Sequence, residues 1–323
     1  MKDLRRIIKA ASYVLLGIAF TLVITTITNA LLTQAERDQY KAPGKVVDVD
    51  GKKIHVHTQG SGSQNVVFLS GLGTLSPEID FRVLSAELKS SFKTNIVEYP
   101  GYGWSSDTDQ LRSTSNSVEE IRAALRAAQV LPPYILVAHS FSGLQSLLYA
   151  NKYPKEISGI VGLDISVPEQ VNYIAWHQQQ VNWYEILRFL GISRIILMFD
   201  PTIAVGHRVD ITVDEITEYS RITNWVVGSH ATFGEANELS TNLRSLLGQK
   251  FPGSIPTILV VASEGANYKG PGISGDVWIK MHQDILEKNA TSRMVILEGD
   301  HYIHHQNESK IAALVREIAK ANN

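Results

Sequence analysis

The stretch Leu136-Val137-Ala138-His139-Ser140-Phe141-Ser142-Gly143 decides how this chain is expected to fold. It continues a run of strand-forming residues, 134–137, and it leads into a helical spacing of Leu144, Leu147, Leu148 and Ala150. A serine between small residues at such a junction is typical of a nucleophile elbow, in which a sharp strand-to-helix turn holds a hydroxyl clear of a sheet. The alternative is a serine that only caps the following helix. Ala138 and Ser142 stand where two glycines are usual, and their small side chains suit a turn that brings two backbones close together.

Strand and helix patterns alternate outward from this stretch. Two short runs at 45–50 and 52–58 predict a hairpin, because they are joined at Asp50-Gly51. The further elements are strands at 65–70, 94–99, 157–165, 257–262 and 293–297, and helices at 118–130 (with Ser117 as its cap), 276–289 and 311–318. This alternation predicts an α/β fold with a mostly parallel, twisted sheet and helices on both faces.

The alternation is interrupted between residues 168 and 252. This segment is helical in character and rich in aromatic residues, and the strand-helix rhythm resumes after it. We therefore interpret residues 168–252 as an inserted helical lid and residues 45–323 as one folded domain.

The N-terminal region differs from the rest of the chain. Residues 1–9 are basic, residues 10–32 contain no charged side chain, and residues 33–44 form a polar linker. An apolar run of this length predicts a transmembrane signal-anchor. Basic residues before it place the N-terminus in the cytoplasm and the folded domain outside. The alternative is a signal peptide cleaved after Ala30 or Ala35, which would leave a secreted protein.

The composition excludes several classes of protein. The formal net charge of −2 gives no reason to expect a nucleic-acid partner, and the absence of cysteine excludes disulfides and cysteine nucleophiles. We find no cofactor motif and no convincing metal-ligand spacing. The oligomeric state is open.

Several loops carry a resemblance to a known family. They are Leu69-Ser70-Gly71-Leu72-Gly73, Glu98-Tyr99-Pro100-Gly101-Tyr102-Gly103-Trp104-Ser105, Ala138-His139-Ser140-Phe141-Ser142-Gly143, and Gly299-Asp300-His301-Tyr302-Ile303-His304. In this order they resemble the oxyanion loop, the Pro-Gly-x-Gly-x-Ser loop, the elbow and the terminal histidine loop of the α/β-hydrolase superfamily. From about Lys45 onward the chain is similar to the serine-hydrolase branch of that superfamily.

The resemblance implies the roles of the site residues. Ser140 is the nucleophile and His301 is its general base, because a serine hydroxyl needs a base to be reactive near neutral pH. The backbone N–H groups of Leu72 and Phe141 form the oxyanion hole. His139 is structural, whereas His304 and His305 are expected in a solvated loop or in contact with the lid.

The acid of the triad has two candidates. The family's usual position, after the strand that follows the lid, is occupied here by Gly265, with Glu264 next to it. The other position known in the family follows the preceding strand, where this chain has Asp164. An aspartate at the end of an apolar strand needs a partner such as a histidine N–H. We therefore favour Asp164, with Glu264 as the alternative.

These residues predict an enzyme that cleaves small-molecule carboxylic esters with an apolar acyl or alcohol group. Haloalkane dehalogenases and epoxide hydrolases of the superfamily are disfavoured, since they place aspartate at the elbow. The same machinery also serves amidases, thioesterases and C–C bond hydrolases. A slow or non-catalytic ligand-binding module on the hydrolase fold and a surface interaction protein are the remaining alternatives.

Overall fold

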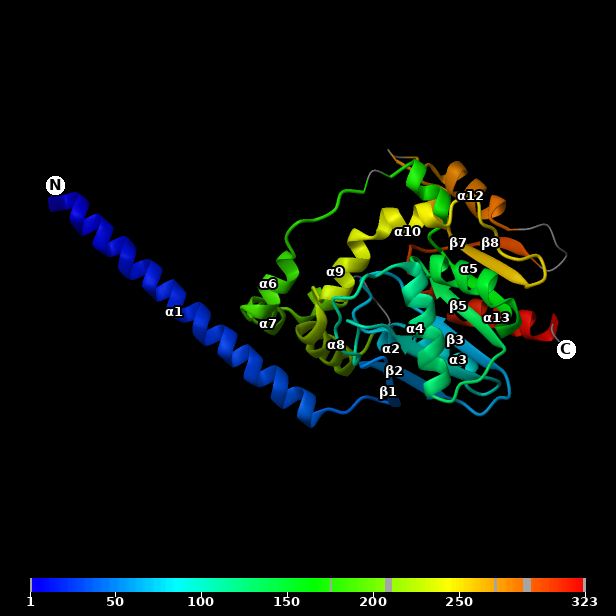
Figure 1. The fold of residues 1–323 in the computed structure, drawn as a ribbon, viewed down its shortest axis with the longest axis horizontal. Helices are drawn as coiled ribbons and strands as arrows, with labels where there is room; N and C mark the ends of the chain where they lie inside the picture. Colours follow the sequence, from blue (N-terminus) through cyan, green and yellow to red (C-terminus); the bar gives the residue numbers. More distant parts are fainter. Residues whose placement is uncertain (1, 175, 207–210, 270–271, 287–291, 322–323) are drawn as a thin grey trace. The chain divides into compact units, whose positions relative to one another are not determined.

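The computed structural model describes residues 2–174, 176–206, 211–269, 272–286 and 292–321 (Figure 1). The chain forms two compact units. One consists of Met1–Lys41 and Val181–Gly228, and the other consists of Ala42–Gln180 and Ser229–Asn323. After the roles that the sequence predicts for them, we call the first the anchor unit and the second the catalytic unit.

The catalytic unit is built on an 8-stranded sheet with the order β1-β2-β4-β3-β5-β6-β7-β8. Its strands are β1 (Lys45–Val49), β2 (Lys52–Gln59), β3 (Asn65–Leu69), β4 (Lys93–Glu98), β5 (Tyr134–His139), β6 (Ile157–Leu163), β7 (Thr257–Ala262) and β8 (Arg293–Leu297). The β1–β2 and β2–β4 pairs are antiparallel, and the strands from β4 to β8 pair in parallel. The mostly parallel sheet predicted from the sequence is confirmed.

Helices cover both faces of this sheet, as predicted. Alternate residues of a strand point to opposite faces, and those of β3 and β5 therefore enter two separate cores. One core joins the sheet to α4 (Thr114–Ala127) and α5 (Ser142–Lys152). The other joins it to α3 (Arg82–Leu88) and α13 (Glu308–Ala321). The remaining helical elements of the unit are α2 (Pro77–Asp80), η1 (Pro154–Glu156), η2 (Pro168–Asn172), α9 (His230–Asn237), α10 (Leu239–Ser245), α11 (Ser263–Ala266), α12 (Gly275–Asp284) and η4 (Ile303–His305).

Several helix boundaries differ from the sequence prediction, most clearly at α4 and α12. Helix α4 begins at Thr114, before the predicted start at residue 118, because Ser113 is its cap and accepts a hydrogen bond from the Asn116 N–H at 3.2 Å. Ser117 lies inside the helix and is buried. Helix α12 ends at Asp284, earlier than predicted, and the last predicted positions, 287–289, lie outside the described residues.

The anchor unit contains the N-terminal helix and the middle of the predicted lid. Its elements are α1 (Lys2–Gln39), α6 (Trp183–Phe189), α7 (Ile192–Phe199), η3 (Pro201–Ala204) and α8 (Val213–Val226). Among the described residues, α1 is the one helix long and apolar enough to cross a membrane, with a mean hydropathy of 2.2 in its most apolar window. The Thr21 and Thr25 hydroxyls donate to the backbone carbonyls of Gly17 and Leu22, which satisfies them within the helix.

Polar contacts join the end of α1 to the lid helices of the same unit. The Asn29 amide donates to the Arg188 carbonyl at 2.9 Å, and its oxygen accepts from Arg194 Nε at 2.9 Å. Arg194 also pairs with Glu36, at 2.5 Å from Nη1 to Oε1. Trp225 Nε1 donates to the same carboxylate at 2.9 Å. Asn29 is only 8% exposed, so the contact is a packed one.

Candidate active site

Ser140 lies on a sharp turn between β5 and α5. Its φ is +55°, which is uncommon for a residue with a side chain and is often found at reactive positions. The backbone around it is tied down, because the Ser140 N–H donates to the Leu163 carbonyl at 3.1 Å and its own carbonyl accepts from Gly143 N at 2.9 Å. The strand-to-helix turn predicted from residues 136–143 is therefore present.

The two small residues around Ser140 fill the roles of the usual glycines. Ala138 is fully buried in the sheet. The Ser142 hydroxyl lies 2.7 Å from the Leu69 carbonyl and 2.8 Å from the His139 carbonyl, so it closes the turn with hydrogen bonds that a glycine could not make. The backbone approaches its neighbours most closely at Gly143 instead, where an added Cβ would lie 2.6 Å from Ile165 Cβ.

The structure brings Ser140, His301 and Asp164 together. His301 Nε2 lies 2.9 Å from Ser140 Oγ, and His301 Nδ1 lies 2.7 Å from Asp164 Oδ2. The three residues follow β5, β8 and β6, so they meet at the carboxyl ends of parallel strands. The His301 side chain is 48% exposed and the Asp164 side chain only 6%. The imidazole is thus open to a ligand while its orienting carboxylate is shielded.

Asp164 directly follows β6 and is held there by hydrogen bonds. Its φ is +43°, and its N–H donates to the Val260 carbonyl at 2.7 Å. While Oδ2 faces His301, Oδ1 accepts from the Ala262 N–H at 3.1 Å and from Trp278 Nε1 at 3.2 Å. Both carboxylate oxygens are therefore used, which compensates the cost of burying the charge.

Glu264, the other candidate for the acid, has no hydrogen bond to His301 among the described residues. It is exposed on α11, and its backbone N–H donates to the Gly299 carbonyl at 3.2 Å. The imidazole nitrogen that an acid would orient faces Asp164 instead. At Gly265 an added Cβ would lie 3.4 Å from Trp278 Nε1. The indole that donates to Asp164 therefore borders the family's usual acid position.

The loop after β3 packs closely against Ser140. A Cβ at Gly71 would come within 2.8 Å of Ser140 Cβ, so only glycine fits there without displacement. In the part of the chain that the structure describes, the backbone N–H groups of Leu72 and Phe141 have no hydrogen-bond acceptor. Two unpaired donors next to a reactive hydroxyl are what an oxyanion hole requires.

A buried series of hydrogen bonds supports this loop, and no pattern in the sequence predicted it. Gly73 N–H donates to the Tyr102 hydroxyl at 3.1 Å, and that hydroxyl donates to Glu235 Oε2 at 2.5 Å. Glu235 comes from α9 and is almost fully buried, and burial raises the pKa of its carboxyl. Glu235 lies among mostly small or polar residues within α9, and its surroundings in the sequence gave no sign of this role.

His139 packs behind the His301 imidazole, as the structural interpretation of this residue requires. Its Nε2–H donates to the His301 carbonyl at 3.0 Å, and the two rings lie 4.9 Å apart. Burial holds the pKa of His139 well below its ordinary value, so the ring is neutral. It thereby fixes the backbone of the histidine loop without adding a charge next to His301.

The expectation for His304 and His305 was wrong. His304 Nε2 lies 2.9 Å from Asp80 Oδ2, and His305 Nε2 lies 2.8 Å from Asp80 Oδ1. His304 is buried and His305 is half-buried, so they belong to the core under the site and not to a solvated loop. Asp80 stands between the apolar residues Ile79 and Phe81 in the sequence, which indicates, as for Asp164, an aspartate that needs a partner but does not identify that partner.

Asp80, His304 and His305 also form a group that could hold a metal ion, found among the residues that the structure describes. Their ligand atoms all lie within 4.8 Å of one another. The two imidazoles lower the pKa of the Asp80 carboxyl well below its usual range, against the opposing effect of burial. Each carboxylate oxygen already has an imidazole partner, so the cluster stabilises its own buried charge.

Comparison with known proteins identifies the family of the fold. The family model described as the α/β hydrolase fold matches residues 64–189. An uncharacterized protein of Bacillus subtilis (strain 168), YbdG, is 31% identical over 233 residues, which cover 70% of this chain and 70% of that protein.

Solved structures show the same fold. An epoxide hydrolase from Vigna radiata superposes with a TM-score of 0.66 at 17% identity, covering 86% of this chain and 97% of that one. A thermophilic esterase from Thermogutta terrifontis superposes with a TM-score of 0.60 at 14% identity, covering 86% and 97%. Together with the sheet order and the elbow, these matches show that the chain belongs to the α/β-hydrolase family.

Proposed function

We propose that this protein is a membrane-anchored serine hydrolase that cleaves carboxylic esters through an acyl-enzyme on Ser140. One observation carries the proposal: His301 lies between the Ser140 hydroxyl and the Asp164 carboxylate, within hydrogen-bond distance of both. A serine, an imidazole and an orienting acid in this arrangement are the parts that acyl transfer needs.

The proposed reaction follows from the positions of these atoms. Ser140 Oγ attacks the acyl carbon and gives its proton to His301 Nε2, while Asp164 Oδ2 stabilises the positive charge that develops on the imidazole. The N–H groups of Leu72 and Phe141 stabilise the negative oxygen of the tetrahedral intermediate. The intermediate collapses when His301 returns the proton to the leaving alcohol. Water then attacks the acyl-enzyme by the same route and releases the acid.

The identity of the nucleophile separates this proposal from epoxide hydrolysis, the activity named for one of the structural neighbours. An aspartate that opens an epoxide forms an ester, which water can hydrolyse. A serine would form an alkyl ether, which this machinery could not release. Ser140 at the elbow therefore favours a substrate with an acyl carbon.

Two features had kept a non-catalytic binding module open: the uncertain acid and the substituted elbow glycines. The contact of Asp164 with His301 and the hydrogen bonds of Ser142 both support a working site. Amides, thioesters and C–C bonds remain alternative substrates for the same residues. The aromatic lid favours an apolar acyl or alcohol group.

The contacts of Asn29 support an anchor that is retained. Cleavage after Ala30 would remove Asn29 from the protein, and cleavage after Ala35 would remove it together with Thr33. These residues hold Arg194 of the lid, through Asn29 Oδ1 and Thr33 Oγ1 at 2.9 Å and 3.0 Å. With the basic N-terminus in the cytoplasm, the catalytic unit would face the outside of the cell membrane.

Labelling with a fluorophosphonate probe tests the proposal, because the probe reacts only with an activated serine. We expect the full-length protein to be labelled, and Ser140→Ala and His301→Ala to lose the label. Ser63→Ala is the control, since this serine lies exposed in a loop. Ester hydrolysis should be lost with the label. Unlabelled folded protein, or undiminished labelling of the Ser140→Ala variant, would overturn the assignment.

A further inference from the structure

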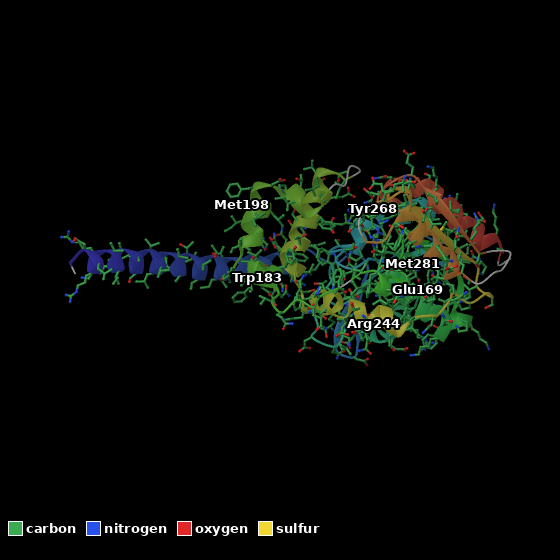
Figure 2. The ribbon with its side chains drawn as sticks, turned by 90° about the horizontal axis from the view of Figure 1, so that it is seen from above. Glu169, Trp183, Met198, Arg244, Tyr268 and Met281 are labelled. Carbon is green, nitrogen blue, oxygen red and sulfur yellow. The ribbon has the colours of Figure 1, made fainter. Side chains whose placement is uncertain are left out.

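The lid helices of the anchor unit carry a large exposed apolar surface. Phe199 is 80% exposed, Met198 73%, Phe189 66% and Trp183 65%. Figure 2 shows the Trp183 and Met198 side chains on this helical segment. The other exposed apolar side chains of the segment are Tyr184, Ile186, Ile195, Ile196 and Ile203. We call this set the apolar lid face. So many large apolar side chains on one short segment mark an interaction surface.

The charged side chains of α6 and α7 are used inside the anchor unit. Arg188 Nη1 donates to the Trp225 carbonyl at 2.7 Å, and Arg194 pairs with Glu36. Asn182 binds Glu185 at the start of α6, with its amide 3.4 Å from the carboxylate. The charges are thus engaged by neighbours in the same unit, and the side chains left exposed on α6 and α7 are mainly apolar.

The position of this segment along α1 indicates what covers the apolar lid face. Gly191, between α6 and α7, packs directly on α1, since a Cβ there would lie 2.9 Å from the Thr25 carbonyl and 3.1 Å from Asn29 Cβ. Thr25 lies inside the charge-free run 10–32. At a rise of 1.5 Å per residue, it is about 10 Å below the end of that run. A helix turn held at this depth would lie within one leaflet of a membrane that α1 spans.

We infer that α6, α7 and η3 insert the apolar lid face into the outer leaflet of the bilayer that α1 crosses. The occupant of this surface is lipid, in the manner of an interfacial helix that buries one apolar face at the boundary of headgroups and acyl chains. The inference rests on the anchor in the proposed function. It deepens that function by favouring esters that partition into the bilayer, because the lid helices α6 and α7 themselves lie in the lipid phase.

The chain has no cysteine, so single labelled cysteines can measure this insertion without background. We would place nitroxide labels on Met198→Cys and Phe199→Cys in the full-length protein, in vesicles of phosphatidylcholine and phosphatidylglycerol. Accessibility to oxygen and to a water-soluble nickel chelate then reports depth. Leu16→Cys, in the middle of α1, tests the anchor, and Lys89→Cys, exposed on the catalytic unit, reports bulk water.

We expect the labels at positions 198 and 199 to be protected from nickel and accessible to oxygen, as at position 16, with position 89 fully exposed to nickel. Nickel-accessible labels at 198 and 199 with a protected label at 16 would overturn the insertion while the anchor stands. A nickel-accessible label at 16 would overturn the anchor and the insertion with it. Spin–spin broadening at 198 and 199 without access to oxygen would show that a second copy covers the face, which also overturns the inference.

A kinetic measurement tests the consequence for substrate. Phe199→Glu should lower hydrolysis of a long-chain ester in the vesicles by about tenfold, because a charge at this depth opposes insertion. Hydrolysis of a short, water-soluble ester should stay unchanged. Phe199→Leu is the matched control and should retain both activities. Equal loss of activity on both esters would contradict a role of the apolar lid face in lipid access. A wild-type protein that hydrolyses neither ester would contradict the proposed function itself.

Discussion

Replacing Asp164 by asparagine gives the sharpest test of the site, because the structure determines how the new amide must lie. Oδ1 of Asp164 accepts from two N–H groups, those of Ala262 and Trp278. An amide NH₂ placed there would face two donors, so the asparagine must turn its oxygen to them. Its NH₂ then faces His301 Nδ1, where the carboxylate Oδ2 now lies at 2.7 Å.

This orientation forces the wrong tautomer on the imidazole. An NH₂ group can only donate to Nδ1, so the proton of the neutral ring moves to Nε2. Nε2 is the atom that must accept the Ser140 proton, and a protonated Nε2 cannot do so. The same exchange in the serine protease triad lowers turnover by about 10⁴-fold. We expect a comparable loss here, which corresponds to about 5 kcal/mol of activation free energy.

The assay is steady-state hydrolysis of a chromogenic ester near neutral pH, with circular dichroism to show that the variant is folded. Glu264→Gln is the control, since Glu264 is exposed and His301 Nδ1 faces Asp164 instead. Its activity should stay within about twofold of wild type, as is usual for surface changes. The reasoning is refuted if Asp164→Asn stays folded and retains more than about a tenth of wild-type activity, because removing a triad acid should leave only about one part in 10⁴.

Three further changes follow from the contacts described above. Gly71→Ala should lower kcat by about 100-fold, the cost of losing one oxyanion donor, because its Cβ would meet Ser140 Cβ at 2.8 Å; an unchanged kcat would contradict the close approach. Asp80→Asn should lower the free energy of unfolding at pH 7 by about 3 kcal/mol, as for a broken buried pair. Because the folded pKa of Asp80 is lowered, this difference should shrink as the pH falls below about 4, and urea unfolding at several pH values checks it. The folded pKa of Glu235 is raised, so the native protein keeps a proton that the unfolded chain releases. The free energy of unfolding should therefore decline as the pH rises from about 4 through the folded pKa. Glu235→Gln should remove that decline in the same measurement.

Much of the fold could be predicted because its strands and helices follow from local patterns of apolar, polar and turn-forming residues. Strands β7 and β8 match the predicted residues, since short apolar runs between turn signals leave little choice of boundary. Helix α4 begins earlier than predicted because its first turn, from Thr114, is polar and only Ser113 identifies the start. Several residues of the segment 113–117 could cap a helix, so the sequence does not identify which of them does.

The site was predictable where a residue has a fixed place after a strand. Ser140, His301 and Asp164 each follow a strand end, so the sheet order brings them together. The Asp80 cluster and the Tyr102–Glu235 contact join residues far apart in the sequence, and no local pattern predicts which partners meet. The same holds for Asn29, whose lid partners lie in a distant segment of the chain.

The place of the acid has a consequence for how such chains are classified. A search pattern that demands a carboxylate directly after β7 meets Gly265 here and would score the triad as incomplete. The carboxylate comes instead from the neighbouring strand, and the Trp278 indole holds it from the side of the vacated position. Relatives that such a pattern scores as incomplete are worth inspecting one strand earlier, where an aspartate directly after β6 would supply the missing carboxylate.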